Sequence, residues 1–161
     1  MRIIGCKGVL YMYTYSVFCV KADVANNYFY KTGILYRFLK EFRENRNCTY
    51  LQLQYKYITE LLTLETISSF IQNLKSEITI EKRDSHVKFY WQDKQLTVYE
   101  DERHIEFTCE SLQDAEDFFF PVLRNLPLHF FITRNSMRDY GWLSFVRSKS
   151  IENRQILYSF H

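Results

Sequence analysis

Glycine and proline are scarce in this chain of 161 residues, which has only 4 glycines and 2 prolines. An average protein contains about 7% Gly and about 5% Pro. Disordered tracts, collagen-like repeats and long flexible linkers depend on these residues or on polar, low-complexity composition, so they are excluded. The length suits one domain whose core needs neither disulfides nor metals.

An excess of one charge is also missing, because 21 Lys and Arg residues against 19 Asp and Glu residues leave a net charge of +2. A protein whose main function is to bind nucleic-acid phosphates usually has a large positively charged surface. The balanced charge argues against that function for this chain. The four cysteines, Cys6, Cys19, Cys48 and Cys109, form no C-x-x-C pair. We therefore expect reduced, buried thiols in a cytoplasmic protein, without disulfides or zinc.

The longest uncharged N-terminal stretch, GVLYMYTYSVFCV at residues 8–20, follows Arg2 and Lys7 as a signal-peptide core would. No small-x-small cleavage site closes it, and it is too short to span a bilayer. Its aromatic and β-branched residues favour a buried central strand over residues 11–20. The sequence therefore predicts neither secretion nor membrane insertion.

Catalytic and metal-binding motifs are also missing. The isolated Gly5-x-x-Gly8 is no phosphate loop, and the chain has no H-E-x-x-H and no G-x-S-x-G. We expect the histidines to be surface or strand residues, and the carboxylates at 100–102 to be solvated in a hairpin turn. The sequence thus predicts no enzyme, no cofactor and no metal.

Helical periodicity dominates the first half of the chain. Asp23 is a candidate cap for a first helix, and Gly33 is expected to mark a kink or a break between two helical pieces. Further helices are predicted over residues 49–62 and from Thr63 or Thr66 to about residue 74. The second piece repeats apolar residues at helical spacing: Leu35, Phe38, Leu39 and Phe42.

The period changes to two at residue 77, where strands are predicted over 77–82, 86–91, 96–99 and 104–109. Their short connections favour an antiparallel meander. Ser111 then opens a helix through a capping box with Asp114, and Pro121 is expected to kink or end that helix near Phe120. With a last strand over 128–133, the prediction is a single α+β domain with a largely antiparallel sheet and about four helices.

Aromatic residues are abundant, with 14 Phe, 13 Tyr and 2 Trp, and most of them should form the core. The helix over 49–62, however, has two apolar stripes, Leu51/Tyr55/Ile58/Leu62 and Leu53/Tyr57/Leu61, which is more than one core contact needs. Tyr28, Gln54, Lys56 and Tyr57 are therefore candidates for recognition. In a competing interpretation, Tyr28 and Tyr57 pack against each other as core. The group Tyr140-Gly141-Trp142-Leu143 is interpreted as a structural lock, with Trp142 filling a gap beneath the sheet.

Several short motifs resemble the family of the sporulation inhibitor of replication protein SirA from endospore-forming bacilli. They are Tyr13-Thr-Tyr15, Ala25-Asn26-Asn27-Tyr28-Phe29, Tyr57-Ile58-Thr59, Asp114-Ala115-Glu116 with Phe119, and Tyr140-Gly141-Trp142-Leu143. The resemblance runs from about residue 11 to 146. Residues 1–11 are therefore expected to be a non-native or flexible N-terminal extension, with Met12 as a natural start, and residues 12–161 a single SirA-like domain.

The resemblance implies a non-enzymatic inhibitor that binds the N-terminal domain of the replication initiator DnaA and prevents new rounds of initiation during sporulation. It implies no direct contact with nucleic acid, membrane or a small-molecule substrate. The family's contact surface maps onto Tyr28, Gln54, Tyr57 and Ile58, and onto Val24, where the family has an aromatic residue. Two alternatives remain open: a cytoplasmic protein-protein interaction module with a different partner, and a small nucleic-acid-binding domain.

Overall fold

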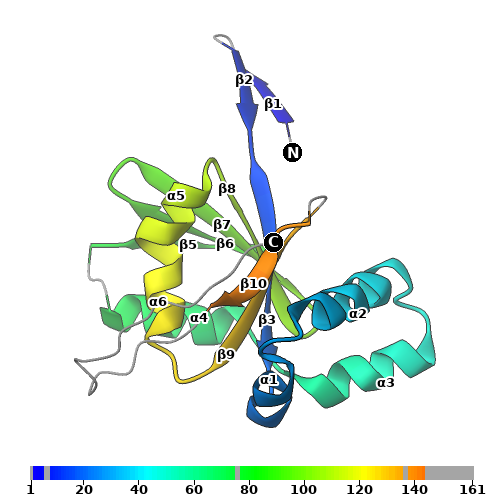
Figure 1. Cartoon of the computed structure of the whole chain (residues 1–161). Coiled ribbons are helices and arrows are strands. Elements are labelled where there is room, and N and C mark those ends of the chain that lie inside the picture. Colours follow the sequence, from blue (N-terminus) through cyan, green and yellow to red (C-terminus); the bar gives the residue numbers. More distant parts are fainter. Residues whose placement is uncertain (1, 6–7, 75–76, 136–137, 144–161) are drawn as a thin grey trace.

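An antiparallel sheet with helices on both faces forms the body of the protein (Figure 1). The computed structural model describes residues 2–5, 8–74, 77–135 and 138–143. The predicted α+β class is confirmed. The strands follow the order β10 (Tyr140–Leu143), β9 (His129–Arg134), β3 (Tyr13–Val20), β8 (His104–Cys109), β7 (Lys94–Asp101), β6 (His86–Trp91) and β5 (Thr79–Lys82), and the short β4 (Thr59–Glu60) pairs with the end of β3.

Strand β3 lies in the middle of this sheet, as its uninterrupted apolar sequence predicted. It pairs with β8 through residues 13–17 and with β9 through residues 15–20. Successive side chains of a strand point to opposite faces. Val17 and Cys19 accordingly belong to one core cluster, and Phe18 and Val20 to another.

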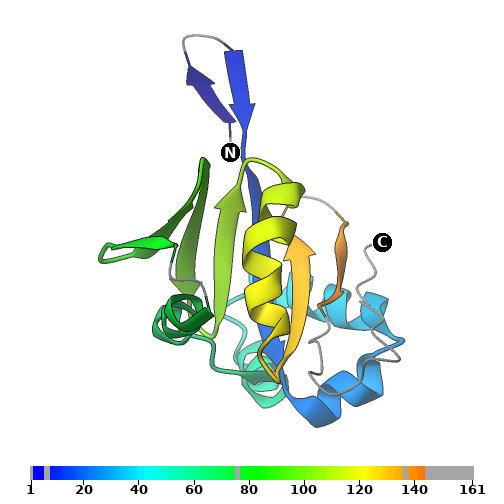
Figure 2. The same cartoon turned by 90° about the vertical axis from the view of Figure 1, so that its left-hand side faces the viewer.

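The second of these cores lies between the sheet and three helices, α1 (Ala22–Tyr28), α2 (Thr32–Glu44) and α3 (Thr49–Ile58). Figure 2 shows this layer behind the sheet. The predicted stripe on α2 is confirmed, since Leu35, Leu39 and Phe42 are buried and Phe38 packs against them. We call α1, α2 and α3 the helical layer.

The first core lies on the opposite face, under α4 (Leu64–Leu74) and a continuous helical stretch. That stretch consists of α5 (Leu112–Asp114), the π-helical η1 (Ala115–Phe119) and α6 (Phe120–Arg124). The predicted cap is confirmed, because the Asp114 amide donates to Ser111 Oγ at 3.3 Å. The expected end near Phe120 is wrong, because the helix continues to Arg124: Pro121 lies in the first turn of α6, where a missing N–H is tolerated, and the wider π turn precedes it. The expected kink stays a prediction.

Three details of the predicted helices in the helical layer are also wrong. Asp23 does not cap α1 but lies in its first turn, where a negative charge still favours the helix dipole. The break between α1 and α2 falls at residues 29–31, and Gly33 lies inside α2. The helix predicted over 49–62 ends at Ile58, because Thr59 and Glu60 pair with the end of β3.

The antiparallel meander of β5 to β8 is confirmed, and β6 and β8 have the predicted bounds. Beyond β9, the group at 140–143 is an additional strand, β10. Trp142 is buried and its indole N–H donates to the Phe29 carbonyl at 3.1 Å. Its ring stacks on Phe29 and meets Phe131 edge-on. This strand therefore joins the sheet to the segment between α1 and α2, which agrees with the predicted lock.

Two short strands at the N-terminus, β1 (Arg2–Gly5) and β2 (Gly8–Tyr11), form a separate antiparallel pair. Figure 1 shows this hairpin extending away from the body of the protein along the line of β3. The expectation that residues 1–11 are an extension of the domain stays a prediction.

The cysteines are partly as expected. Cys19 and Cys109 are free and buried, and burial raises the pKa of each thiol to about 12. Cys48 is free but exposed, which corrects the prediction of a buried thiol. Cys6 lies outside the described residues.

Replacing Trp142 by alanine should test the lock between β10 and the helical layer. We expect Trp142→Ala to lower the free energy of unfolding by about 3–5 kcal/mol, because it leaves a large cavity and an unpaired Phe29 carbonyl. Urea unfolding followed by circular dichroism measures this change. Tyr30→Ala, at a side chain that is 94% exposed, is the matched control and should cost little; equal effects of the two changes would contradict the lock.

Candidate functional site

Four of the five residues proposed from the sequence as a contact surface line one hollow. Val24 and Tyr28 come from α1, and Gln54 and Ile58 from α3. The hollow has a volume of about 220 Å³, and α2 closes it with Ile34, Leu35 and Phe38. Residues that are about thirty positions apart in sequence are thus brought together by the packing of three helices.

The walls of this hollow differ in burial. Val24 is buried, Tyr28 and Ile58 are half-buried, and Gln54 is exposed. The Gln54 amide donates to the Tyr50 hydroxyl at 3.0 Å, and the Lys31 ammonium lies 5.9 Å from the centre of the Tyr28 ring. The result is an apolar floor with polar groups around its edge, an arrangement that suits a protein partner.

Tyr57 does not line the hollow but lies on the same side of α3. Residues 54, 57 and 58 are three and four positions apart, so they share one face of the helix. Tyr57 is 71% exposed, and the Lys21 ammonium lies 5.3 Å from the centre of its ring. This exposure contradicts the interpretation of Tyr28 and Tyr57 as a core pair. We call Val24, Tyr28, Gln54, Tyr57 and Ile58 the α1/α3 patch.

The second apolar stripe predicted for residues 49–62 faces solvent. Leu53, Tyr57 and Leu61 are between 59% and 71% exposed, although Leu61 lies beyond the end of α3. Sequence reasoning missed Tyr50, which is also exposed and lies seven positions before Tyr57 on the same helix face. An exposed aromatic and aliphatic stripe next to a hollow is typical of an interaction surface.

The family model described as sporulation inhibitor of replication protein SirA matches residues 13–147. The chain belongs to the SirA family. A search among curated proteins gives no match.

The match to the SirA family covers the whole sheet and all five residues of the α1/α3 patch. The family's description makes this chain a member of a group of sporulation inhibitors of replication, which are regulators. Within the residues that the structure describes, no helix has the length and apolar character needed to cross a membrane.

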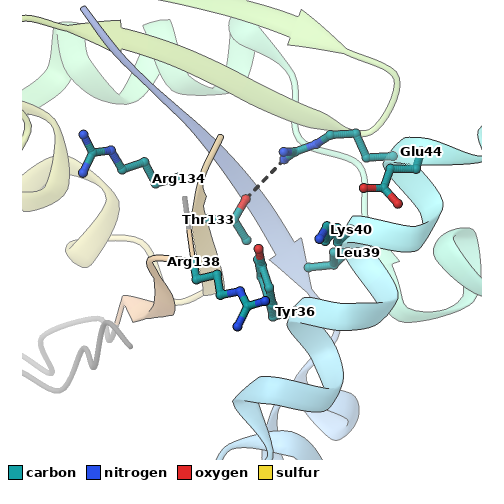
Figure 3. Close-up of a pocket in the computed structure, with 8 residues that line it drawn as sticks. Tyr36, Leu39, Lys40, Glu44, Thr133, Arg134 and Arg138 are labelled. Atoms are coloured by element: carbon teal, nitrogen blue, oxygen red, sulfur yellow. Dashed lines mark hydrogen bonds between the residues drawn. The ribbon is translucent and has the colours of Figure 1, made fainter. Parts of the chain in front are cut away.

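A second and larger hollow of this SirA-family protein lies between α2 and β9 (Figure 3). It has a volume of about 420 Å³ and differs from the first in its lining, which is rich in cations. We call it the basic hollow. Its lining residues are Tyr36, Leu39, Lys40, Arg43, Glu44, Thr133, Arg134 and Arg138.

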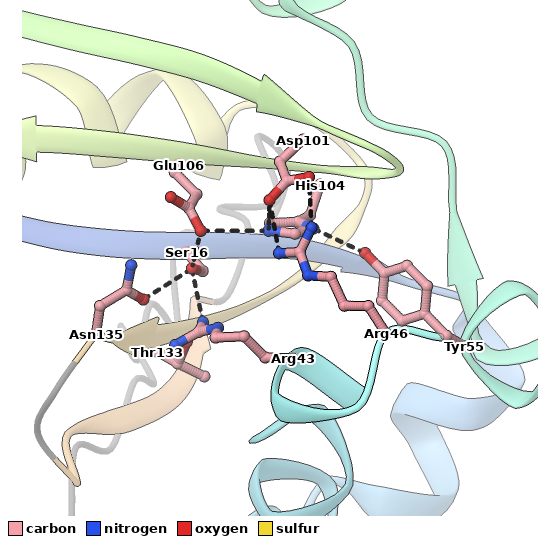
Figure 4. A network of polar contacts seen from close by, with 9 residues as sticks. All are labelled: Ser16, Arg43, Arg46, Tyr55, Asp101, His104, Glu106, Thr133 and Asn135. Carbon is pink, nitrogen blue, oxygen red and sulfur yellow. Dashed lines mark hydrogen bonds and ion pairs between the residues drawn. The ribbon is translucent and has the colours of Figure 1, made fainter. Parts of the chain in front are cut away.

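Beside this hollow, a partly buried polar network joins the sheet to the helical layer (Figure 4). Arg46 donates to both carboxylate oxygens of Asp101, at 2.8 and 2.6 Å. His104 is buried, and its Nδ1 lies 3.0 Å from the Tyr55 hydroxyl of α3. The prediction that the carboxylates at 100–102 are solvated is therefore wrong for Asp101, because its partner comes from the segment between α2 and α3.

Asp101, His104 and Glu106 also form a trio of metal-binding side-chain types in the described part of the chain, with ligand atoms within 4.8 Å of one another. Both oxygens of Asp101 already accept hydrogen bonds from Arg46. A divalent ion would have to displace this guanidinium. The trio therefore fits an ion-pair network better than a metal centre.

The network also shifts two pKa values. The hydrogen bonds from Arg46 lower the pKa of Asp101, and the proximity of His104, whose Nε2 lies 3.6 Å from Glu106 Oε1, lowers the pKa of Glu106. A carboxyl whose pKa is lower in the folded than in the unfolded state stabilises the fold above its unfolded pKa. This contribution is lost as the pH falls through the lower, native value.

Asp101→Asn should test this contribution. We expect the variant to lose about 1 kcal/mol of the free energy of unfolding at pH 7, because a half-exposed bidentate ion pair is removed. The difference from the wild-type protein should narrow as the pH is lowered from about 5 to about 2, where the native carboxyl also becomes protonated. Urea unfolding at several pH values measures both effects. Asp93→Asn, at an exposed turn residue, is the control; a difference that does not change with pH would contradict the assignment.

Proposed function

We propose that this SirA-family protein inhibits the initiation of chromosome replication during sporulation by binding the N-terminal domain of the initiator DnaA through the α1/α3 patch. The observation that carries the proposal is the convergence of Val24, Tyr28, Gln54 and Ile58 on one hollow. These positions match the contact surface that the family resemblance implies. Such an inhibitor acts where DNA is replicated, so a cytoplasmic location belongs to the proposal.

The burial pattern of the patch supports a protein partner. Tyrosine is enriched at interface hot spots, because its ring buries a large area while its hydroxyl keeps a polar contact. Tyr57 exposes its ring beside a hollow with an apolar floor. Gln54, which lines this hollow on the same helix as Tyr57, offers the partner a polar contact. A partner that covers these groups buries aromatic area at the centre and leaves the polar edge in contact with water.

Charges around the patch indicate the chemistry of the partner's surface. The ammonium groups of Lys21 and Lys31 lie near the rings of Tyr57 and Tyr28, and Lys56 is exposed on α3. Complementary acidic groups on the partner would speed association and make it sensitive to salt. We therefore expect the bound surface of the DnaA domain to carry carboxylates at the rim of the contact.

The two alternatives differ in what they need from this surface. An interaction module with a different partner would use the same patch, so only a binding measurement with the purified DnaA domain separates it from the proposal. A nucleic-acid-binding domain needs a basic face that follows phosphates. The apolar floor of the hollow and the exposed stripe of α3 favour a protein over a nucleic acid.

Tyr57→Ala tests the patch directly. We expect it to weaken binding to the N-terminal domain of DnaA from the same host by about 2 kcal/mol or more, which is roughly a thirtyfold increase in Kd. The unfolding midpoint should stay nearly unchanged, because the Tyr57 ring contributes little to the core. Calorimetric titration and thermal unfolding of the same sample measure the two quantities.

The matched control for this experiment is Tyr90→Ala on β6. This strand lies next to the edge strand β5, whereas the helical layer packs on β3, β9 and β10. Tyr90→Ala removes the same side chain far from the patch and should leave the affinity unchanged. Normal binding by the Tyr57 variant would show that the patch is misassigned. A wild-type protein that is folded but gives no heat of binding would refute DnaA as the partner.

Val24→Phe tests the hollow. Val24 is buried and borders about 220 Å³ of open volume at a position where the family pattern has an aromatic residue. A ring placed there fills the hollow and adds apolar contact area, so we expect binding to tighten about threefold to tenfold. Weaker binding in the same titration would mean that a side chain of the partner occupies the hollow instead.

A further inference from the structure

The basic hollow continues into a second depression of about 490 Å³ along α2. The two depressions share three lining residues, Tyr36, Lys40 and Arg138. Tyr36 stacks on Tyr140 of β10, with ring centres 4.2 Å apart. One elongated depression thus has a cationic part next to β9 and an aromatic pair along its side. It lies on α2, β9 and β10, whereas α1 and α3 carry the α1/α3 patch.

The charges of the basic hollow do not balance. Arg134 is already held elsewhere, because it pairs with Asp139 at 3.2 Å and lies over the Tyr13 ring, and Figure 3 shows it pointing away from the other side chains. Lys40, Arg43 and Arg138 remain, and among the lining residues that the structure describes Glu44 is the one carboxylate. Lysine and arginine side chains only donate hydrogen bonds. The hollow therefore suits an anion with several acceptor atoms.

Arg43 supplies the strongest indication. Its guanidinium is half-buried, and its Nη2 donates to two neutral hydroxyls, Ser16 Oγ at 2.8 Å and Thr133 Oγ1 at 3.2 Å. Its Nε is buried and has no hydrogen-bond partner among the described residues. Burial lowers the pKa of this guanidinium, although the Glu106 and Asp101 carboxylates nearby raise it, and neither of them pairs with Arg43 directly among the described residues. A partly buried cation without a direct counter-ion is costly, and an anion in the adjoining hollow would reduce that cost.

We propose that the basic hollow binds a small phosphate-bearing molecule of nucleotide size. The phosphate would lie against Lys40, Arg43 and Arg138, since arginine and lysine are the usual partners of phosphate oxygens. The rest of the ligand would extend along α2 beside the Tyr36–Tyr140 pair. The volume of the hollow lies in the range of small-molecule sites, and a concave shape fits such a ligand better than a DNA duplex.

Calorimetric titration of the full chain tests this site with two probes, inorganic pyrophosphate and ADP. Pyrophosphate carries the anionic group alone, and ADP adds a sugar and a base. We expect saturable binding of ADP with a Kd below about 1 mM and weaker binding of pyrophosphate. The paired change Lys40→Gln and Arg138→Gln should weaken ADP binding at least about tenfold. Both side chains are exposed, so this variant should keep its fold.

Lys82→Gln, which removes one exposed cation on β5 at the far edge of the sheet, is the control and should bind ADP normally. Three results would overturn the proposal. They are the absence of binding by either probe at about 1 mM, binding that the paired change leaves unaltered, and binding of duplex DNA that is tighter than that of ADP under the same salt conditions.

Discussion

Strand β3 is buried on both faces, and the position of every other layer depends on this burial. Its alternating side chains contribute Val17 and Cys19 to the core under α4 to α6, and Phe18 and Val20 to the core under the helical layer. A shift of one residue in its pairing would exchange the two sets. Pairing with β8 on one side and β9 on the other prevents this shift. The helices that carry the α1/α3 patch are thus placed by the same strand that holds the opposite core.

Elements whose signal is local were predictable from the sequence. The meander needs only alternating residues and short turns, and the Ser111 cap needs only its own neighbours. Helix α3 ends four residues early because Thr59 and Glu60 pair with β3, whose partner residues are about forty positions away. The continuation of the helix past Pro121 likewise depends on a π turn, which no pattern of residues in the sequence predicts.

The candidate sites were likewise predictable only where the signal lies within one segment of the sequence. The exposed stripe of α3 was predictable, because a helix with two apolar stripes can bury only one of them against a single core. The charge of the basic hollow was not, since Lys40 and Arg138 come from segments about a hundred residues apart and the net charge of +2 conceals their proximity. The burial of His104 was missed for a similar reason. Its neighbours are Tyr55 from α3 and the carboxylates of Asp101 and Glu106. The sequence pattern placed Asp101 in a solvated turn and Glu106 in an ordinary strand.

The polar network around Asp101 and His104 is linked to the α1/α3 patch through Tyr55. Its ring stacks on Phe42 with centres 4.0 Å apart, and its hydroxyl lies within hydrogen-bond distance of His104 in the sheet. Gln54 precedes it directly, and Tyr57 and Ile58 follow within one turn of α3. Because Tyr55 fixes the rotation of α3 against the sheet, the outward face of this helix has one orientation. A surface held in this way loses little conformational freedom on binding, so more of its contact energy can appear as affinity.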